Sequence, residues 1–413
     1  MGIVKSLKCI VCGLLYQERD EPLTCTRCGR EGILDVVYDY DAAAQLLTKE
    51  NLAANRDFSH WRYKPLLPVV DDMELPPLRV GWSPLYRSER LARYVDVKQL
   101  YLKDDGQNPT NSLKDRASSV GVARAMAAGR EGITCASTGN AATSLAGNAA
   151  SVGLKSYIFV PHRIPGAKLA QLLVFGAVVF IVQGTYEDAF ELSMESSERF
   201  RWYNRNSAIN PYLIEGKKTA AFESCEQLGW ELPDVIAISV GDGCSIAGFW
   251  KGMKELKQLG LITRLPRLLG VQANGAAPIA AAWKQGAESI QPLVPDTIAD
   301  SISVGTPRNW RKALRAVRES SGMFITVSDD QILEAMRITG SRAGVFGEPA
   351  GITSVAGLIA ARKQGLIAST ATALGVITGN GLKDTESAIR SCEGKEHRIE
   401  PAFHNVMNIV GKI

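Results

Sequence analysis

Short apolar runs alternate with longer amphipathic stretches along most of the chain. The runs are rich in Val and Ile and are bounded by Gly, Asp or Asn, which is typical of strands buried on both faces. The stretches between them repeat apolar residues every three to four positions, which predicts helices. We expect strands at Leu100–Lys103, Ile133–Ala136, Ser156–Val160, Val178–Val182, Val235–Val240, Leu268–Val271 and Ala373–Thr378. We expect helices at Asp115–Ala128, Ala141–Ser151, Ala167–Phe175, Tyr186–Tyr203, Thr219–Leu228, Ile246–Leu259, Asp329–Arg342 and Ser354–Lys363.

The strand–helix alternation predicts an α/β protein with parallel sheets that helices cover on both faces. A chain of 413 residues is too long for one small domain. We expect a cysteine-rich segment at residues 1–34, a small domain at 116–214, and a large domain built from 35–115 and 215–413.

Composition and charge give the chain no special class. Apolar residues make up 46% and charged residues 22%, and the net charge is +4, an ordinary globular balance. The longest apolar run, Leu172 to Val182, is shorter than the roughly 20 residues of a membrane helix, and its glycine favours a helix end, a turn and a buried strand. We therefore expect neither a nucleic-acid nor a membrane partner.

The first thirty residues carry two CxxC motifs, each followed by a glycine. Each motif places two thiolates on one turn, and two such turns together form the tetrahedral Cys₄ site of a zinc ribbon. The expected ligands are Cys9, Cys12, Cys25 and Cys28. A closed Cys₄ site leaves no open position for water, so this zinc would be structural. The alternatives are unrelated free thiols and a ribbon that binds nucleic acid.

The other four cysteines are scattered, which favours a reducing cytoplasm over a disulfide framework.

Lys114 lies where turn residues give way abruptly to a helical pattern, so it stands at or near the start of a helix. The helix dipole disfavours a cation there, which lowers the pKa of the amine and suits imine formation. Asp115 and Arg116 can hold the local geometry by ion pairing. From this segment alone, a solvated surface lysine is the competing interpretation.

Three more predicted strands end in small polar residues or glycines. Ser137 to Gly139 can bind an anion such as a carboxylate at the following helix start, and Gly241 to Ser245 can cradle a phosphate. Thr378 ends the last strand, with a hydroxyl that would face the same edge. Each segment alone is equally compatible with a plain capped helix or a tight turn.

Together these segments resemble the threonine synthases of the tryptophan-synthase-β-like fold, which is fold type II of the pyridoxal-phosphate (PLP) enzymes. Asn108–Ala117 is similar to that family's NPTxSxKDRA motif, Ala136–Ala142 to ASTGNAA, and Thr378–Asp384 to TGNGLKD. Further similarities lie at Gly81–Leu85, Asn206–Thr219 and Glu348–Ala350. Many members also begin with a segment similar to a zinc ribbon.

The resemblance implies a PLP-dependent lyase, a homodimer, that converts the amino acid O-phospho-L-homoserine and water into L-threonine and phosphate. Lys114 is similar to the lysine that holds PLP as a Schiff base and shuttles protons. The implied cofactor-binding residues are Lys114, Asn140, Gly241, Asp242, Gly243, Cys244, Ser245 and Thr378. The implied substrate-binding residues are Ser137, Thr138, Asn206 and Ser207.

Two residues depart from the family's pattern. Leu213 stands where many members carry Arg, and Asp242 where they carry Asn; both positions are linked in the family to the substrate phosphate. The residues that could compensate are Lys168, Lys217, Arg163 and Arg308. The departures favour an alternative, a paralogous PLP lyase or β-replacement enzyme similar to serine or threonine dehydratase.

Overall fold

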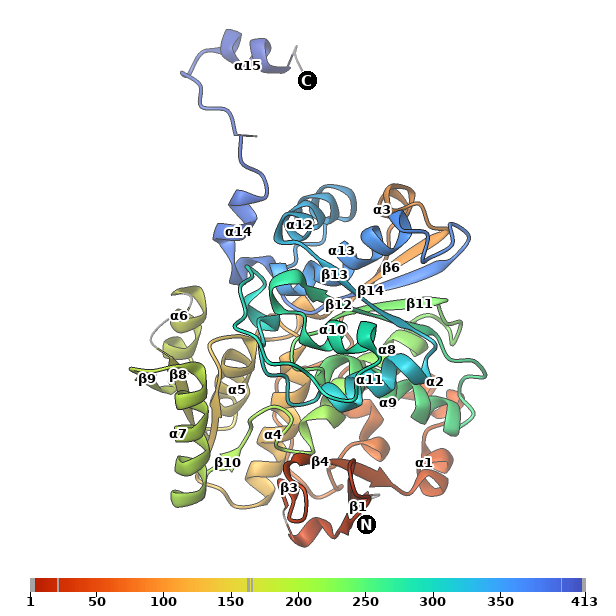
Figure 1. Cartoon of the computed structure of the whole chain (residues 1–413), viewed down its shortest axis with the longest axis vertical. Helices are drawn as coiled ribbons and strands as arrows, with labels where there is room; N and C mark the ends of the chain where they lie inside the picture. The colour runs from red at the N-terminus through yellow and green to blue at the C-terminus, as the bar shows by residue number, and fades with distance from the viewer. Residues whose placement is uncertain (1–3, 21, 162–163, 165, 395, 411–413) are drawn as a thin grey trace.

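The computed structural model describes residues 4–20, 22–161, 164, 166–394 and 396–410, which form three sheets with helices around them (Figure 1). Arg163, one of the residues considered above, lies outside these ranges. Among the described residues, no helix is both long enough and apolar enough to cross a membrane.

The largest sheet has six strands in the order β13-β12-β11-β14-β6-β5. Its neighbouring strands are parallel, apart from the antiparallel pair of β5 and β6. The strands are β5 (Leu85–Arg87), β6 (Gln99–Asp104), β11 (Val235–Ser239), β12 (Arg267–Ala273), β13 (Met323–Val327) and β14 (Thr372–Ile377).

Both faces of this sheet are buried, which explains its continuous apolar strands. Ile236 and Ile238 face one core while Val235 and Ala237 face the other. On the first side lie α8 (Leu213–Gln227), α9 (Cys244–Gln258), α10 (Pro278–Gln285) and α11 (Trp310–Glu319). On the second lie α3 (Glu89–Val95), α12 (Asp329–Ala343) and α13 (Pro349–Lys363).

The second sheet is fully parallel, in the order β10-β7-β8-β9. Its strands are β7 (Gly132–Ala136), β8 (Lys155–Pro161), β9 (Val178–Val182) and β10 (Tyr203–Asn204). Its helices are α4 (Lys114–Ala127), α5 (Asn140–Ala150), α6 (Gly166–Val174) and α7 (Tyr186–Arg199).

Four sequence expectations need correction. The expected buried strand β9 lies at the sheet edge, where Val178, Phe180 and Ile181 are exposed. The expected helix from Tyr186 to Tyr203 stops at Arg199, because the chain turns with a positive φ at Arg201 and then enters β10. The helices expected from Thr219 and from Ser354 begin earlier, at Leu213 and at Pro349.

The third sheet is antiparallel and holds the cysteine-rich segment, in the order β2-β1-β4-β3. Its strands are β1 (Val4–Cys9), β2 (Leu15–Tyr16), β3 (Thr24–Cys25) and β4 (Gly29–Tyr38), followed by α1 (Tyr40–Leu46) and α2 (Lys49–Ala54).

This third sheet is joined to the large sheet's helices by buried polar contacts. The Tyr38 hydroxyl donates to Glu215 Oε2 at 2.9 Å, and Lys251 Nζ donates to the Val36 carbonyl at 2.7 Å. Lys218 and Lys251 both pair with Glu215 at 2.6 Å. The network fixes β4 against α8 and α9.

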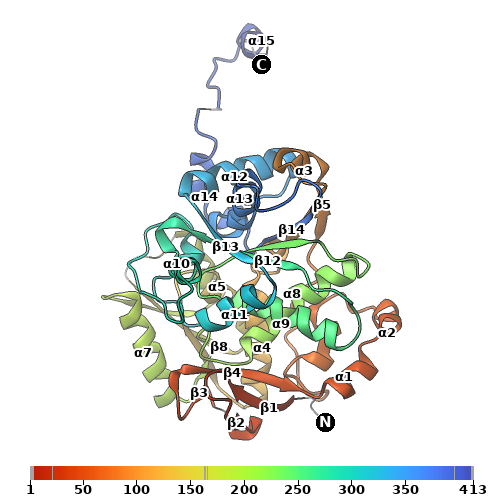
Figure 2. The same ribbon diagram turned by 45° about the vertical axis from the view of Figure 1, so that its right-hand side comes forward.

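The C-terminal segment leaves the body of the molecule. Its first helix, α14 (Thr385–Arg390), still packs beside α12 with Ala388 partly buried, whereas α15 (Phe403–Val410) lies beyond it. In both ribbon views α15 stands clear of the rest (Figures 1 and 2).

Candidate active site

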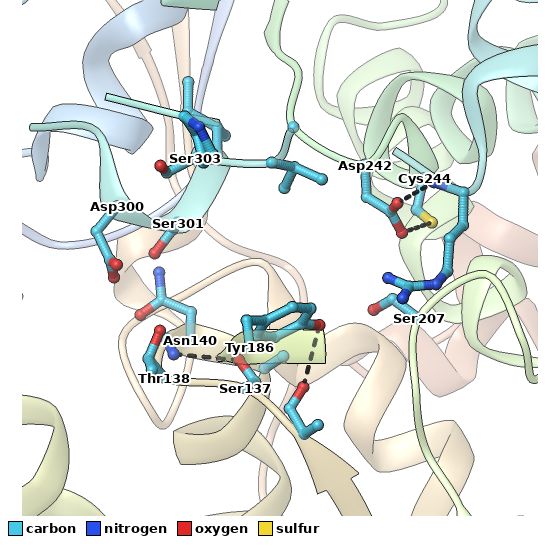
Figure 3. A pocket seen from close by; sticks show the side chains of 18 of the residues that line it. Ser137, Thr138, Asn140, Tyr186, Ser207, Asp242, Cys244, Asp300, Ser301 and Ser303 are labelled. Atoms are coloured by element: carbon cyan, nitrogen blue, oxygen red, sulfur yellow. Dashed lines mark hydrogen bonds between the residues drawn. The ribbon is translucent and has the colours of Figure 1, made fainter. Parts of the chain in front are cut away.

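A cavity of about 840 Å³ lies where the carboxyl ends of the strands of the two parallel sheets meet. Ligands are expected at this place in open α/β sheets, because they bind at the carboxyl ends of the strands, beside helix N-termini. Every residue predicted to bind cofactor or substrate lines this cavity (Figure 3). Those residues are Lys114, Ser137, Thr138, Asn140, Asn206, Ser207, Gly241, Asp242, Gly243, Cys244, Ser245 and Thr378.

Lys114 is the first residue of α4, and its side chain faces the cavity. Burial and, after it, the neighbouring charge of Lys217 lower the pKa of Lys114 to about 8. The direction of this shift matches the sequence prediction, but desolvation rather than the helix dipole is its main cause. Roughly a fifth of this amine is therefore neutral at about pH 7.4, against about a thousandth for a lysine of ordinary pKa.

Asp115 and Arg116 hold the start of α4, though not by pairing with each other. Asp115 accepts from the backbone N–H and hydroxyl of Thr110 at 2.9 and 2.8 Å. Arg116 is fully buried and pairs with Asp105 and Glu223. Lys114 consequently stands on a rigid support.

The turn between β11 and α9 is shaped by two glycines. Gly243 has a φ of +93°, in the region that favours glycine, and a methyl group there would lie 2.9 Å from Ala313 Cβ. A methyl group on Gly241 would lie 2.8 Å from Ile302 Cα. No side chain caps the N-terminus of α9, so its backbone N–H groups can bind an anion at the cavity.

Asp242, in the same turn, is held by its neighbours. Its Oδ1 accepts from the Arg308 backbone N–H at 2.6 Å, and its Oδ2 accepts from the Cys244 thiol at 3.5 Å (Figure 3). Burial raises the pKa of Cys244 to about 11, which keeps this thiol protonated at neutral pH.

A second helix start, that of α5, opens onto the cavity opposite the glycine turn (Figure 3). The Gly139 N–H donates to Ser137 Oγ at 3.1 Å, and no side chain caps α5. Asn140 Nδ2 donates to the buried Glu348, whereas Asn140 Oδ1 is buried with no partner among the described residues.

Thr378 is brought to Lys114 by backbone pairing. The Leu113 N–H donates to the Thr378 carbonyl at 2.9 Å, and Ser112 pairs with Gly379. No hydrogen bond from the Thr378 hydroxyl to another described residue is present. That hydroxyl is therefore available at the cavity wall.

Asn206 and Ser207 line the cavity with part of their polar groups already used. Asn206 Oδ1 accepts from the Ala136 N–H at 2.8 Å, and its Nδ2 donates to Ser193 Oγ at 3.1 Å. Ser207 Oγ accepts from Arg205 at 3.3 Å. Their role in substrate binding stays a prediction.

Sequence reasoning did not find several lining residues, among them Arg205, Tyr186 and the loop from Leu293 to Gly305. The loop closes on itself through the Leu293 N–H and the Gly305 carbonyl at 3.2 Å. Such a loop has no periodicity that would mark it in the sequence. Arg205 had one available signal, since it directly precedes the Asn206-Ser207 motif.

The two CxxC turns come together outside this cavity, whose lining contains none of their cysteines. Their four sulfur atoms lie within 4.8 Å of one another, and Cys12 Sγ and Cys25 Sγ are 3.7 Å apart. A tetrahedron with Zn–S bonds of about 2.3 Å has sulfur–sulfur edges of about 3.8 Å. Gly13 and Gly29 adopt the positive φ expected after the second cysteine of each motif.

The fold and the lysine-centred cavity define a PLP enzyme of fold type II. The family described as "Pyridoxal-phosphate dependent enzyme" matches residues 77–379. The chain belongs to the threonine synthase family within this group. It is 40% identical over 388 residues to the threonine synthase of Methanocaldococcus jannaschii, covering 94% of this chain and 95% of that one.

Two further threonine synthases support the assignment. That of Methanosarcina acetivorans is 40% identical, over 94% of each chain. That of Mycobacterium tuberculosis strain H37Rv is 39% identical, over 79% of this chain and 89% of that one.

Solved structures agree with the fold. Diaminopropionate ammonia lyase from Escherichia coli has a TM-score of 0.67 at 18% identity, covering 87% of this chain and 94% of that one. Threonine deaminase isoform 2 from Solanum lycopersicum has a TM-score of 0.63 at 21% identity, with 86% and 93% covered.

Proposed function

We propose that this protein is a threonine synthase that uses PLP to convert O-phospho-L-homoserine and water into L-threonine and phosphate. The observation that carries the proposal is the joining of Lys114, two uncapped helix starts and Thr378 around one cavity, in a chain whose relatives over nearly its whole length are threonine synthases.

The cavity fits PLP at three points. Gly241 and Gly243 have no side chains to cover the backbone of the turn, so the N–H groups at the start of α9 can hold the cofactor's phosphate. Asn140 Oδ1 is buried without a partner, which suits a hydroxyl donor of the cofactor. The Thr378 hydroxyl can pair with the ring nitrogen without forcing its protonation.

Lys114 performs the proton transfers. When bound, PLP supplies the aldehyde that takes up the substrate amine and the conjugated ring that draws electrons from Cα. With a pKa lowered to about 8, Lys114 Nζ can accept the proton from Cα and then from Cβ, and it can return protons later in the reaction. The bond from Cγ to the phosphate oxygen breaks, the electron pair leaves with phosphate, and water adds at Cβ.

The start of α5 positions the substrate. Ser137, Thr138 and the N–H groups that follow form a cradle for its carboxylate, across the cavity from the glycine turn. A carboxylate held there and an amine held above Lys114 fix Cα between two points. The reacting hydrogens then face the lysine.

The test is a substrate panel on the purified holoenzyme. Threonine and phosphate should form in equal amounts from O-phospho-L-homoserine, and Lys114→Ala should abolish both the coloured cofactor band and the activity. Keto-acid formation from serine or threonine, without threonine formation, would instead establish the dehydratase-like alternative.

We further infer that the Cys₄ cluster holds a structural zinc ion, that the enzyme is a homodimer, and that it works in the cytoplasm without nucleic-acid partners. The spacing of the four sulfur atoms supports the zinc. All eight cysteines are free, which agrees with a reducing compartment. Metal analysis and light scattering test the first two inferences.

A further inference from the structure

Apart from Lys114, two cations in the cavity wall make no ion pair with a described residue. The side chains of Arg205 and Lys217 are 0% and 2% exposed, and both line the cavity. Among the described residues, the Arg205 guanidinium donates only to the hydroxyls of Ser118 and Ser207, and its Nη2 is buried without a partner. Lys217 makes no hydrogen bond to another described residue.

Such isolation is costly, because a buried charge is normally compensated by an opposite one. Several other buried cations of this chain are paired with a carboxylate. Lys103 pairs with Glu223, Lys168 with Asp300, and Lys218 with Glu215. Arg205 and Lys217 therefore form a site whose missing partner is an anionic ligand.

The remaining cations of the cavity region are already engaged. Arg308 donates to both carboxylate oxygens of Glu187 at 3.0 Å, and Lys168 lies 2.7 Å from Asp300. Of the compensating residues suggested by the sequence and described in the structure, only Lys217 faces the cavity without a partner.

Arg205 lies beside the position that lacks the family's usual arginine. A methyl group on Gly121 would lie 3.2 Å from Leu213 Cδ2 and 3.7 Å from Arg205 Cγ, so these two side chains meet on the same part of α4. A guanidinium from residue 205 can thus replace one from residue 213. Lys217 stands at a position that the family's EGxKT pattern leaves open.

We propose that Arg205 and Lys217 together bind the phosphate group of the substrate and stabilise it as it departs. This inference rests on the proposed function, which brings two phosphate groups into one cavity. The glycine turn accommodates the cofactor's phosphate with backbone N–H groups, and the two cations accommodate the second dianion. The charge that grows on the departing phosphate oxygen then faces a guanidinium and an ammonium group.

Asp242 sets a limit on this site. Its carboxylate is turned toward the Arg308 N–H and the Cys244 thiol, at 2.6 and 3.5 Å. Two donors hold the negative charge there. Arg205 and Lys217 together carry two positive charges against the single negative charge of Asp242, so the site keeps a net positive charge for an anion.

The first experiment uses Lys217→Gln holoenzyme, with Lys254→Gln as the matched control. Lys254 is exposed, pairs with Glu319 and does not line the cavity, so its substitution removes an equal charge outside the site. In Lys217→Gln, the KM for O-phospho-L-homoserine and the inhibition constant of inorganic phosphate should rise roughly ten- to a hundredfold. Both should be unchanged in Lys254→Gln.

The second measurement asks which phosphate the cations hold. PLP affinity, followed by the visible band of reconstituted apoenzyme, should be the same in Lys217→Gln and in the unmodified protein. Arg205→Met should behave like Lys217→Gln. Weakened PLP binding with an unchanged substrate KM would overturn the proposal, because the cations would then serve the cofactor. Unchanged values throughout would overturn it as well.

Failure of the proposed function is distinguishable from failure of this inference. Calorimetric binding of inorganic phosphate to holoenzyme needs no turnover. If the unmodified protein makes no threonine but its phosphate binding depends on Lys217, the function is wrong and the anion site stands. If threonine forms and the affinity for phosphate is the same with and without the Lys217→Gln substitution, the proposed anion site is refuted and the proposed function is supported.

Discussion

The two ends of α9 allow a sharp test of the glycine turn. Gly243 precedes the helix with a φ of +93°, and Gly260 follows it with a φ of +73°. An alanine side chain at 260 meets no atom within 4 Å, whereas at 243 it would lie 2.9 Å from Ala313 Cβ and 3.0 Å from the Asn309 carbonyl. Gly243→Ala and Gly260→Ala should therefore both strain a left-handed backbone conformation, but only Gly243→Ala also brings a side chain into close contact with neighbouring atoms.

The magnitudes follow from these contacts. A left-handed backbone conformation costs an L-residue about 1–2 kcal/mol, so Gly260→Ala should destabilise the protein by that amount. Overpacking adds about 1–3 kcal/mol at residue 243. The crowded neighbours cannot easily withdraw, because the Asn309 N–H is bonded to the Asp242 carbonyl at 3.1 Å. The turn itself must move, and PLP binding should weaken roughly five- to a hundredfold.

The assay is titration of each apoenzyme with PLP, followed by its visible band, together with urea unfolding of the apoenzymes. Gly260→Ala should bind PLP normally and unfold at lower urea. Gly243→Ala should show both defects. If Gly243→Ala bound PLP as tightly as Gly260→Ala does, the assignment of this turn to the cofactor's phosphate would be refuted.

Three further outcomes are expected. Because the pKa of Lys114 is lowered to about 8, the rate of PLP capture by apoenzyme should rise with pH up to about pH 8 and then level off, and a rate that did not change below pH 8 in stopped-flow traces would contradict this pKa. Between pH 8 and 10.5 the unfolded chain binds a proton that the folded chain has lost, so this group should make the apoenzyme more stable as pH rises, and urea unfolding curves that did not shift over that range would contradict it as well. Asp242→Asn keeps an acceptor for the Arg308 N–H but removes a negative charge from the phosphate-binding side of the cavity. The KM for O-phospho-L-homoserine should therefore fall several-fold. A rise in KM would show that the carboxylate itself is needed. Cys25→Ser, or chelation, should release zinc and lower the melting temperature while PLP remains bound, as metal analysis and calorimetry would reveal.

The sequence predicted the site better than it predicted the helices around it. The strands that reach the cavity are apolar runs followed directly by glycine, serine or threonine. This change of composition predicted Ser137, Gly241 and Thr378 as site residues. All of them line the same cavity. The motifs also placed Lys114 at a helix start, and α4 begins at that residue.

Hydrophobic periodicity failed where polar side chains are buried. The start of α8 was missed because the charged residues Glu215, Lys217 and Lys218 interrupt the apolar pattern, yet all three are buried. The prediction for β9 was wrong in the opposite sense, because the apolar residues of this edge strand are exposed. Side chains that meet only in three dimensions, such as Arg205 beside Leu213, leave no local pattern to find.

The contacts between β4 and the helices behind the cavity bear on how this enzyme can be shortened. The Tyr38 hydroxyl donates to Glu215 on α8, the helix that carries Lys217. The Val36 carbonyl accepts from Lys251 on α9, the helix that follows the glycine turn. Removing the first forty residues would uncover a cluster of acids and lysines that water would then enter. A minimal catalytic version of this protein would need a new polar cover on that side before it could keep its active-site helices in place.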